Sequence, residues 1–155
     1  AYYGEMATYL GMTAPMSVFA LVSWLRNPHN GNKAEVEIAR LKKAEIFNMV
    51  VLAVIVTVVF YFILRAFNTS NLVPSTASVT TSFLAVYMTY KRSPFFALAY
   101  AANDIILIVL WTLAALSDIS YIAVITCFVL FLINDIYTFI NWTRMHKRQE
   151  ISQTV

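Results

Sequence analysis

Apolar stretches of about 20 residues, separated by short polar segments, dominate the sequence. An α-helix of that length rises ~30 Å, which matches the hydrocarbon core of a bilayer. The composition agrees, because 60% of the residues are hydrophobic and only 12% are charged. A soluble domain of this size needs more charge to cover its surface. The sequence therefore predicts an all-α integral membrane protein.

About five transmembrane helices are expected. Their predicted ranges are residues 4–25, 46–65, 74–90, 93–116 and 117–143. Pro15 removes a backbone hydrogen bond within the first helix and should bend it. The second helix is rich in Val, Ile and Phe on all sides, which favours contact with lipid. The third has many Ser and Thr residues in its first half, so we expect it to face other helices or a wet cavity.

The predicted loops lie alternately on the two sides of the membrane, and Lys and Arg residues are concentrated in the loops of one side. Of the 11 such residues, Arg65 alone lies on one side. The others lie in residues 26–43, at Lys91 and Arg92, and in residues 144–148. Because cytoplasmic loops carry the excess of positive charge, the C-terminus is predicted to be cytoplasmic and the first helix to begin outside. Four or six helices would break this alternation.

The polar segment 27–45 has a helical pattern in its second half. Ala34, Ile38 and Leu41 fall on one stripe with charged residues around it, which predicts a short amphipathic helix at the membrane interface. Residue 1 is Ala, and residues 1–9 already resemble the outer end of a spanning helix. We therefore expect the chain to begin within a longer protein.

Two acidic residues, Asp104 and Asp135, lie within predicted spans, and each follows an asparagine. An acid at the centre of a spanning helix costs ~2.5–3.5 kcal/mol on insertion scales. No Lys or Arg lies mid-span to pair with them, so they must use water, amides, hydroxyls or a cationic ligand. Helical spacing places aromatic and amide side chains on nearby faces. The candidate site residues are Asn103, Asp104, Trp111, Asn134, Asp135, Tyr137, Asn141 and Trp142.

Two interpretations of these residues stay open. They can be hydrogen-bonding contacts that hold helices together, or they can line a cavity for a ligand. Two Asn-Asp pairs on neighbouring helices favour the cavity. Trp24 and Trp142 each lie close to an arginine, so each fits either a platform for a substrate or an anchor at the membrane interface.

Enzyme chemistry is not indicated. His29 and His146 lie in polar segments without acidic or cysteine residues at metal-ligand spacing. Cys127 lies within an apolar run and is interpreted as a packing residue. The three glycines form no phosphate-binding loop, and the basic residues lie between apolar runs rather than on a nucleic-acid-binding face. We expect no catalytic residue, no metal and no cofactor.

Two segments resemble those of PnuC-type nicotinamide riboside transporters of bacteria. Residues 23–36, which begin Ser-Trp-Leu-Arg-Asn-Pro, resemble the loop after that family's third helix. The closing pattern Asn134-Asp135-x-Tyr137-x-x-x-Asn141-Trp142, with its basic tail, resembles the end of the last helix. The resemblance covers essentially all 155 residues and leaves the family's first two helices unmatched.

The resemblance implies a three-plus-one-plus-three arrangement of helices with parallel repeats. The ends of the first and last predicted helices, residues 19–26 and 137–144, share an aromatic residue, a Trp and an Arg at matching offsets, which either a repeat or two similar anchors explains. In this arrangement the parts are residues 1–26 (last helix of a first bundle), 27–45 (cytoplasmic loop with the amphipathic helix), 46–66 (linker helix), 74–144 (second three-helix bundle) and 145–155 (cytoplasmic tail).

The resemblance also implies a homotrimer in the bacterial inner membrane that takes up nicotinamide riboside by facilitated diffusion, with phosphorylation in the cytoplasm trapping it. The chain departs from the family at Phe96 and Ala99, where many members have tryptophan, and near Ala85, where glutamine is common. These departures leave the substrate open. A sugar carrier, an ion-coupled carrier and a non-transporting scaffold or enzyme subunit remain as alternatives.

Overall fold

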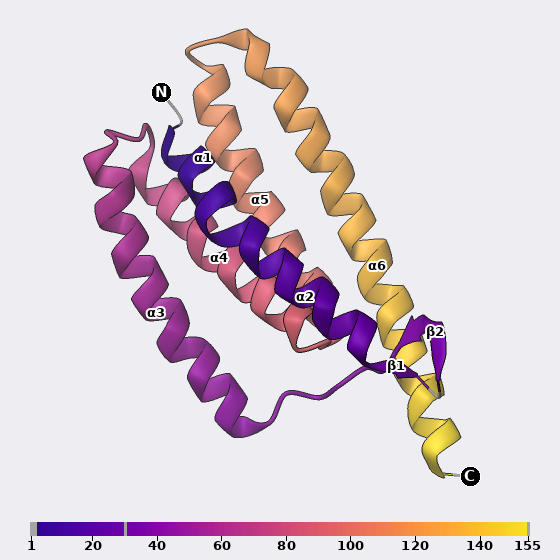
Figure 1. Ribbon diagram of the computed structural model, residues 1–155. Helices are drawn as coiled ribbons and strands as arrows, with labels where there is room; N and C mark the ends of the chain where they lie inside the picture. The colour runs from indigo at the N-terminus through magenta and orange to yellow at the C-terminus, as the bar shows by residue number, and fades with distance from the viewer. Residues whose placement is uncertain (1–2, 30, 155) are drawn as a thin grey trace.

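The structure is a computed structural model that describes residues 3–29 and 31–154, and it shows a bundle of long helices (Figure 1). The helices are α1 (Tyr3–Thr8), α2 (Ala14–Arg26), α3 (Lys43–Ala66), α4 (Leu72–Tyr90), α5 (Phe96–Ala115) and α6 (Ile122–Thr154). A small antiparallel hairpin pairs β1 (Pro28–His29) with β2 (Asn32–Val36). The prediction of an all-α membrane fold is confirmed, and the hairpin is a local exception to it.

The first predicted helix is interrupted before its proline. A wide π-helical segment, Tyr9–Thr13, separates α1 from α2, and Pro15 lies in the first turn of α2. A proline there has no N–H to donate to the preceding turn, and an expanded turn accommodates that loss. The irregularity therefore coincides with the predicted bend.

Within the described part of the chain, four helical segments are long and apolar enough to cross a membrane: Met6–Arg26, Lys43–Ala66, Phe96–Ala115 and Ile119–Ile151. The remaining predicted span, residues 74–90, corresponds to α4, which has 19 residues and lies among the other helices (Figure 1). It runs between the end of α3 and the start of α5, which lie at opposite ends of the bundle. Its serines and threonines lower its hydropathy, but its neighbours cover them.

The central helix of the bundle is α4, which packs against α2, α3 and α5, while α6 packs on α5. Ser75, Ser78 and Ser82 on α4 are buried, with 0%, 3% and 4% of their surfaces exposed. This confirms that the hydroxyl-rich helix faces other helices. By contrast, α3 exposes large apolar side chains such as Phe47 and Phe62 along its length, as expected for a helix in contact with lipid.

The amphipathic helix predicted within residues 27–45 is wrong. The segment forms the β1–β2 hairpin, turns at Gly31 with a φ of 76°, and is then extended up to α3. Ile38 is buried as the periodicity suggested, but in an extended segment. The last turns of α6 offer hydrogen-bonding partners to this backbone, so the segment does not need a helix of its own to satisfy its polar groups.

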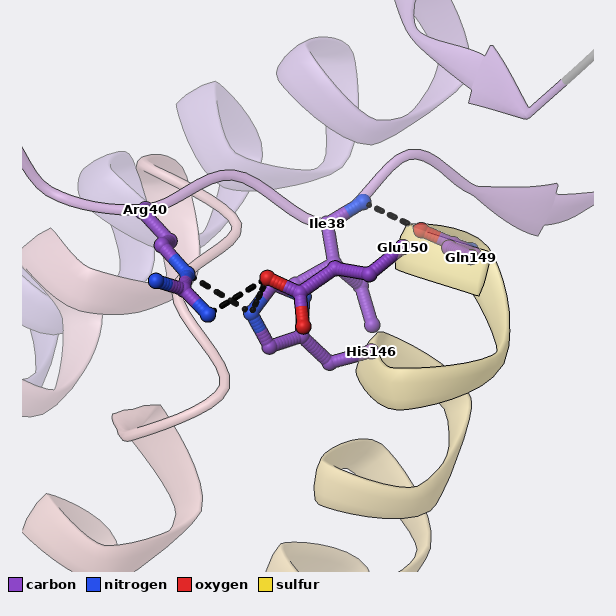
Figure 2. A network of polar contacts seen from close by, with 5 residues as sticks. All are labelled: Ile38, Arg40, His146, Gln149 and Glu150. Atoms are coloured by element: carbon purple, nitrogen blue, oxygen red, sulfur yellow. Dashed lines mark hydrogen bonds and ion pairs between the residues drawn. The ribbon is translucent and has the colours of Figure 1, made fainter. Parts of the chain in front are cut away.

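We call this contact the C-terminal clasp, formed by residues 35–40 and residues 146–150. The Gln149 side chain, with 3% of the residue exposed, accepts a hydrogen bond from the Ile38 N–H at 3.0 Å and donates to the Val36 carbonyl at 3.0 Å. Arg40 pairs with Glu150 and donates from Nε to His146 Nε2 at 3.2 Å (Figure 2). The predicted tail, residues 145–155, is thus helical as far as Thr154.

A second ion pair in the clasp joins Glu35 to Arg148 at 2.6 Å. Hydrogen bonds from Gln149 and Arg148 lower the pKa of Glu35, so the Glu35 carboxylate stays charged well below neutral pH. The loop between α4 and α5 lies at the same end of the bundle, because the Ala39 N–H donates to the Arg92 carbonyl at 3.1 Å. Basic residues from three separate segments therefore meet at one end of the molecule.

Candidate functional site

A pocket of about 450 Å³ lies between α2, α5 and α6. This volume is within the usual range for sites that bind small molecules. Its walls combine aromatic rings, two carboxyl groups, an amide and a hydroxyl. The lining residues are Trp24, Phe96, Tyr100, Asp104, Phe131, Asn134, Asp135, Thr138 and Trp142.

Helical spacing explains how these side chains reach one pocket. Phe96, Tyr100 and Asp104 are four residues apart on α5 and therefore lie on one face. On α6 the lining residues recur at intervals of three and four, from Phe131 to Trp142. The two stripes face each other because α5 and α6 pack together as antiparallel neighbours (Figure 1).

Three aromatic rings meet at the end of the pocket nearest the clasp. The Phe96 ring lies 4.7 Å from the Trp142 ring in an edge-to-face arrangement, and the rings of Trp24 and Trp142 are 5.1 Å apart. Trp24 is fixed from behind, because its indole N–H donates to the Thr89 carbonyl of α4 at 2.8 Å. These rings offer π-faces and edges to a flat ligand, and their faces attract a cation.

The two acids lie farther from the clasp along α5 and α6 than these rings do. Asp104, 5% exposed, and Asp135, half-buried, bring their carboxyl groups into contact across the space between α5 and α6. Asp104 Oδ2 is buried and meets no N–H or O–H donor in the part of the chain that the structure describes. Asn134 lines the same pocket. The structure thus places Asp104, Asn134, Asp135 and Trp142 together.

Asn103 lies on a different side of α5 from its neighbour Asp104. Its Oδ1 accepts hydrogen bonds from three α4 hydroxyls: Ser78 at 3.1 Å, Thr81 at 2.8 Å and Ser82 at 3.2 Å. Asn103 is buried, with 6% of its surface exposed, and does not line the pocket. In this arrangement it holds α4 and α5 together.

The other three predicted site residues also lie outside the pocket. Trp111 is two turns beyond Asp104 on α5, where its ring lies 5.2 Å from the ring of Tyr121. Tyr137 is 65% exposed on the outer surface of α6. Asn141 lines a separate hollow near the basic end of the molecule, together with Arg144 and Arg148.

Five lining residues were missing from the predicted site: Trp24, Phe96, Tyr100, Phe131 and Thr138. A signal for two of them was present, because Phe96 and Tyr100 precede Asp104 at intervals of four residues. Phe131 and Thr138 lie on the same helical stripe as Asp135. Extending each acid's stripe in both directions along its helix would have found these four residues.

Comparison with known families decides what kind of protein carries this pocket. The profile of the family described as nicotinamide mononucleotide transporter matches residues 1–144. The chain belongs to this family. Because the family consists of transporters, its membership confirms the predictions of a PnuC-type relative and of a protein that is not an enzyme.

One solved structure shares the fold of this family member. The crystal structure of the vitamin B3 transporter PnuC matches with a TM-score of 0.75 and 24% sequence identity, over 95% of this chain. The match covers 64% of the PnuC chain, so the present chain spans about two thirds of its length. Among curated protein sequences, none matches this chain.

Proposed function

We propose that the full-length protein transports nicotinamide riboside into the cell by facilitated diffusion, and that the pocket between α2, α5 and α6 binds it. The family match supports a substrate related to nicotinamide. The observation that carries the proposal is the meeting of aromatic rings and unneutralised carboxyl groups in one pocket. Nicotinamide riboside has a flat cationic ring, a carboxamide and ribose hydroxyls, and these groups need such partners.

Each group of the ligand has a partner in the pocket. The rings of Trp24, Phe96 and Trp142 can contact the pyridinium ring, and each cation–π contact contributes ~0.5–2 kcal/mol. The Asn134 amide can pair with the carboxamide. The Asp104 and Asp135 carboxyl groups can accept from ribose hydroxyls or balance the charge of the ring. We propose passive transport because the described residues include no group of acidic, His and Cys side chains that could hold a coupling metal ion.

The membrane placement and the assembly are part of the proposal. The basic end of the bundle faces the cytoplasm, in keeping with the charge asymmetry of the loops, and the membrane is the bacterial inner membrane. The protein assembles as a homotrimer, as its resemblance to PnuC-type transporters implies. Native mass spectrometry of the full-length protein in detergent checks the assembly.

A binding titration of the full-length protein tests the function. We expect saturable binding of nicotinamide riboside, weaker binding of nicotinamide and none of a sugar. Trp142→Leu removes an aromatic wall of the pocket and should weaken binding about tenfold, which corresponds to ~1.4 kcal/mol. Trp111→Leu is the matched control, since Trp111 is on α5 outside the pocket and its loss should leave affinity unchanged.

The same titration separates the alternatives. Preference for the sugar, or binding that requires Na⁺, would replace the proposal with a sugar carrier or an ion-coupled carrier. Absence of saturable binding of every compound would indicate a scaffold. Equal effects of the Trp142 and Trp111 substitutions would contradict the assignment of the pocket.

A further inference from the structure

Asp104 and Asp135 bring two carboxyl groups together in one pocket. Two carboxylates in contact in a medium of low dielectric constant repel each other strongly, so both are ionised only when a cation is near. Among the described residues, no Lys or Arg lines this pocket. An empty site therefore lacks a positive charge of its own.

The surroundings of the pair supply a hydrogen bond from the Asn134 side chain to the Asp135 carboxyl group, but no positive charge among the described lining residues. Tyr100 on α5 is the remaining titratable residue among those described as lining the pocket, and α2 contributes Trp24. The α4 hydroxyls that face this part of α5 donate to Asn103 instead. Lys91, a basic side chain of the loop after α4, is 2.7 Å from Glu45 and is committed to that ion pair.

The geometry points to an acid pair that holds one proton when the pocket is empty and releases it when a monocation binds. A shared proton provides an O–H donor between two carboxyl groups that are otherwise both acceptors. Asp104 Oδ2 is buried and meets no donor among the described residues. A shared proton or a bound cation would give this oxygen a partner. This inference rests on the proposed binding of nicotinamide riboside and concerns its binding step. If the pair regains its proton from the cytoplasm after release, uptake exchanges one proton for each cation and is not simple facilitated diffusion.

Charge balances in this exchange. The empty pair with one proton carries a single negative charge. The occupied pair has lost that proton to water and carries two, and the cationic ring supplies one positive charge. The net charge of the pocket is the same in both states, so ligand binding adds no net charge to the membrane interior. A neutral ligand of the same shape cannot displace the proton, so the pair selects for cations.

Calorimetric titration in two buffers with different ionisation enthalpies measures the protons released. For the full-length protein we expect about one proton per nicotinamide riboside bound at acidic pH. Below the pH at which the empty pair loses its proton, the affinity should fall about tenfold per pH unit. The reduced riboside, which has the same shape and a neutral ring, should bind more weakly and release no proton.

Asp135→Asn leaves a single carboxyl group in the pocket and should abolish both the proton release and the pH dependence of affinity. Asp118→Asn makes the same chemical change in the loop before α6, outside the pocket, and should retain both. Nicotinamide riboside binding without proton release, and with equal affinity from about pH 6 to pH 8, would overturn the inference and leave the proposed function intact. If the riboside does not bind at all, the proposed function is wrong, and this inference with it.

Discussion

Asn103 and Asn134 show how one residue type serves two purposes in the same bundle. Asn103 is buried and accepts from three hydroxyls of α4, whereas Asn134 lines the pocket. Both precede an aspartate, and adjacent residues on a helix point about 100° apart. If the aspartate of each pair faces the pocket, its asparagine lies toward one edge of the pocket or beyond it. The neighbouring helices decide which.

The two asparagines should therefore respond differently to substitution by leucine. Asn103→Leu removes an acceptor from three hydroxyls, and we expect it to lower the free energy of unfolding by about 1–2 kcal/mol, since such contacts average ~0.6 kcal/mol each in membrane proteins. Affinity in the folded fraction should not change. Asn134→Leu should weaken riboside binding about tenfold and leave stability unchanged. Thermal unfolding in detergent and a binding titration of both variants measure the difference.

The opposite result, with Asn103→Leu folding normally but failing to bind, would mean that Asn103 is a ligand contact. The sequence could place Asp104, Asn134, Asp135 and Trp142 together, because charged and amide side chains are conspicuous in apolar helices. It could not separate Asn103 from them, because α4 and the pocket both offer polar surroundings. Aromatic lining residues such as Phe131 look like ordinary lipid-facing residues unless the helical stripe of the nearby acid is extended to them.

At the scale of elements, the long helices were predictable and the segment before α3 was not. Helices in a bilayer must satisfy their own backbone hydrogen bonds, so an apolar run of sufficient length leaves no other solution. Residues 27–42 lie outside the apolar spans, where backbone groups can pair with other segments. The Asn30-Gly31 dipeptide is typical of a hairpin turn, but the helical spacing of Ala34, Ile38 and Leu41 favoured a helix instead.

The C-terminal clasp yields a prediction at this scale. Gln149→Leu leaves the Ile38 N–H and the Val36 carbonyl without their partner, so it should destabilise the docking of the last turns of α6 by about 1–3 kcal/mol. Arg148→Gln is the control, because the exposed Arg148–Glu35 ion pair contributes ~1 kcal/mol or less. Hydrogen exchange of residues 145–151 measures both effects. Equal protection in the Gln149 variant and the unaltered protein would show that the clasp does not hold the helix.

At the scale of the whole molecule, the loops rich in Lys and Arg lie at one end of the bundle, and the loops poor in these residues lie at the other end. The hairpin, the loop between α4 and α5, and the end of α6 are joined by hydrogen bonds and ion pairs at one end of the bundle. The loops at the other end, after α3 and after α5, contain no Lys or Arg beyond Arg65. Local charge counts thus predicted which loops share a side, because each helix crosses the bundle once.

The membrane orientation follows from the same asymmetry and can be tested with single cysteines. Cys127 is exposed on α6, so Cys127→Ser removes the thiol of these 155 residues, and any cysteine elsewhere in the full-length protein is replaced in the same way. In that background, Ser117→Cys before α6 should react with a membrane-impermeant maleimide added to intact cells, because the poorly charged end faces outward. Lys147→Cys at the basic end should react only after the membrane is permeabilised. Both positions are exposed, so a difference in labelling reports the side of the membrane and not burial in the protein. The reverse pattern would show that the basic end is external, and the direction of transport would have to be reassigned.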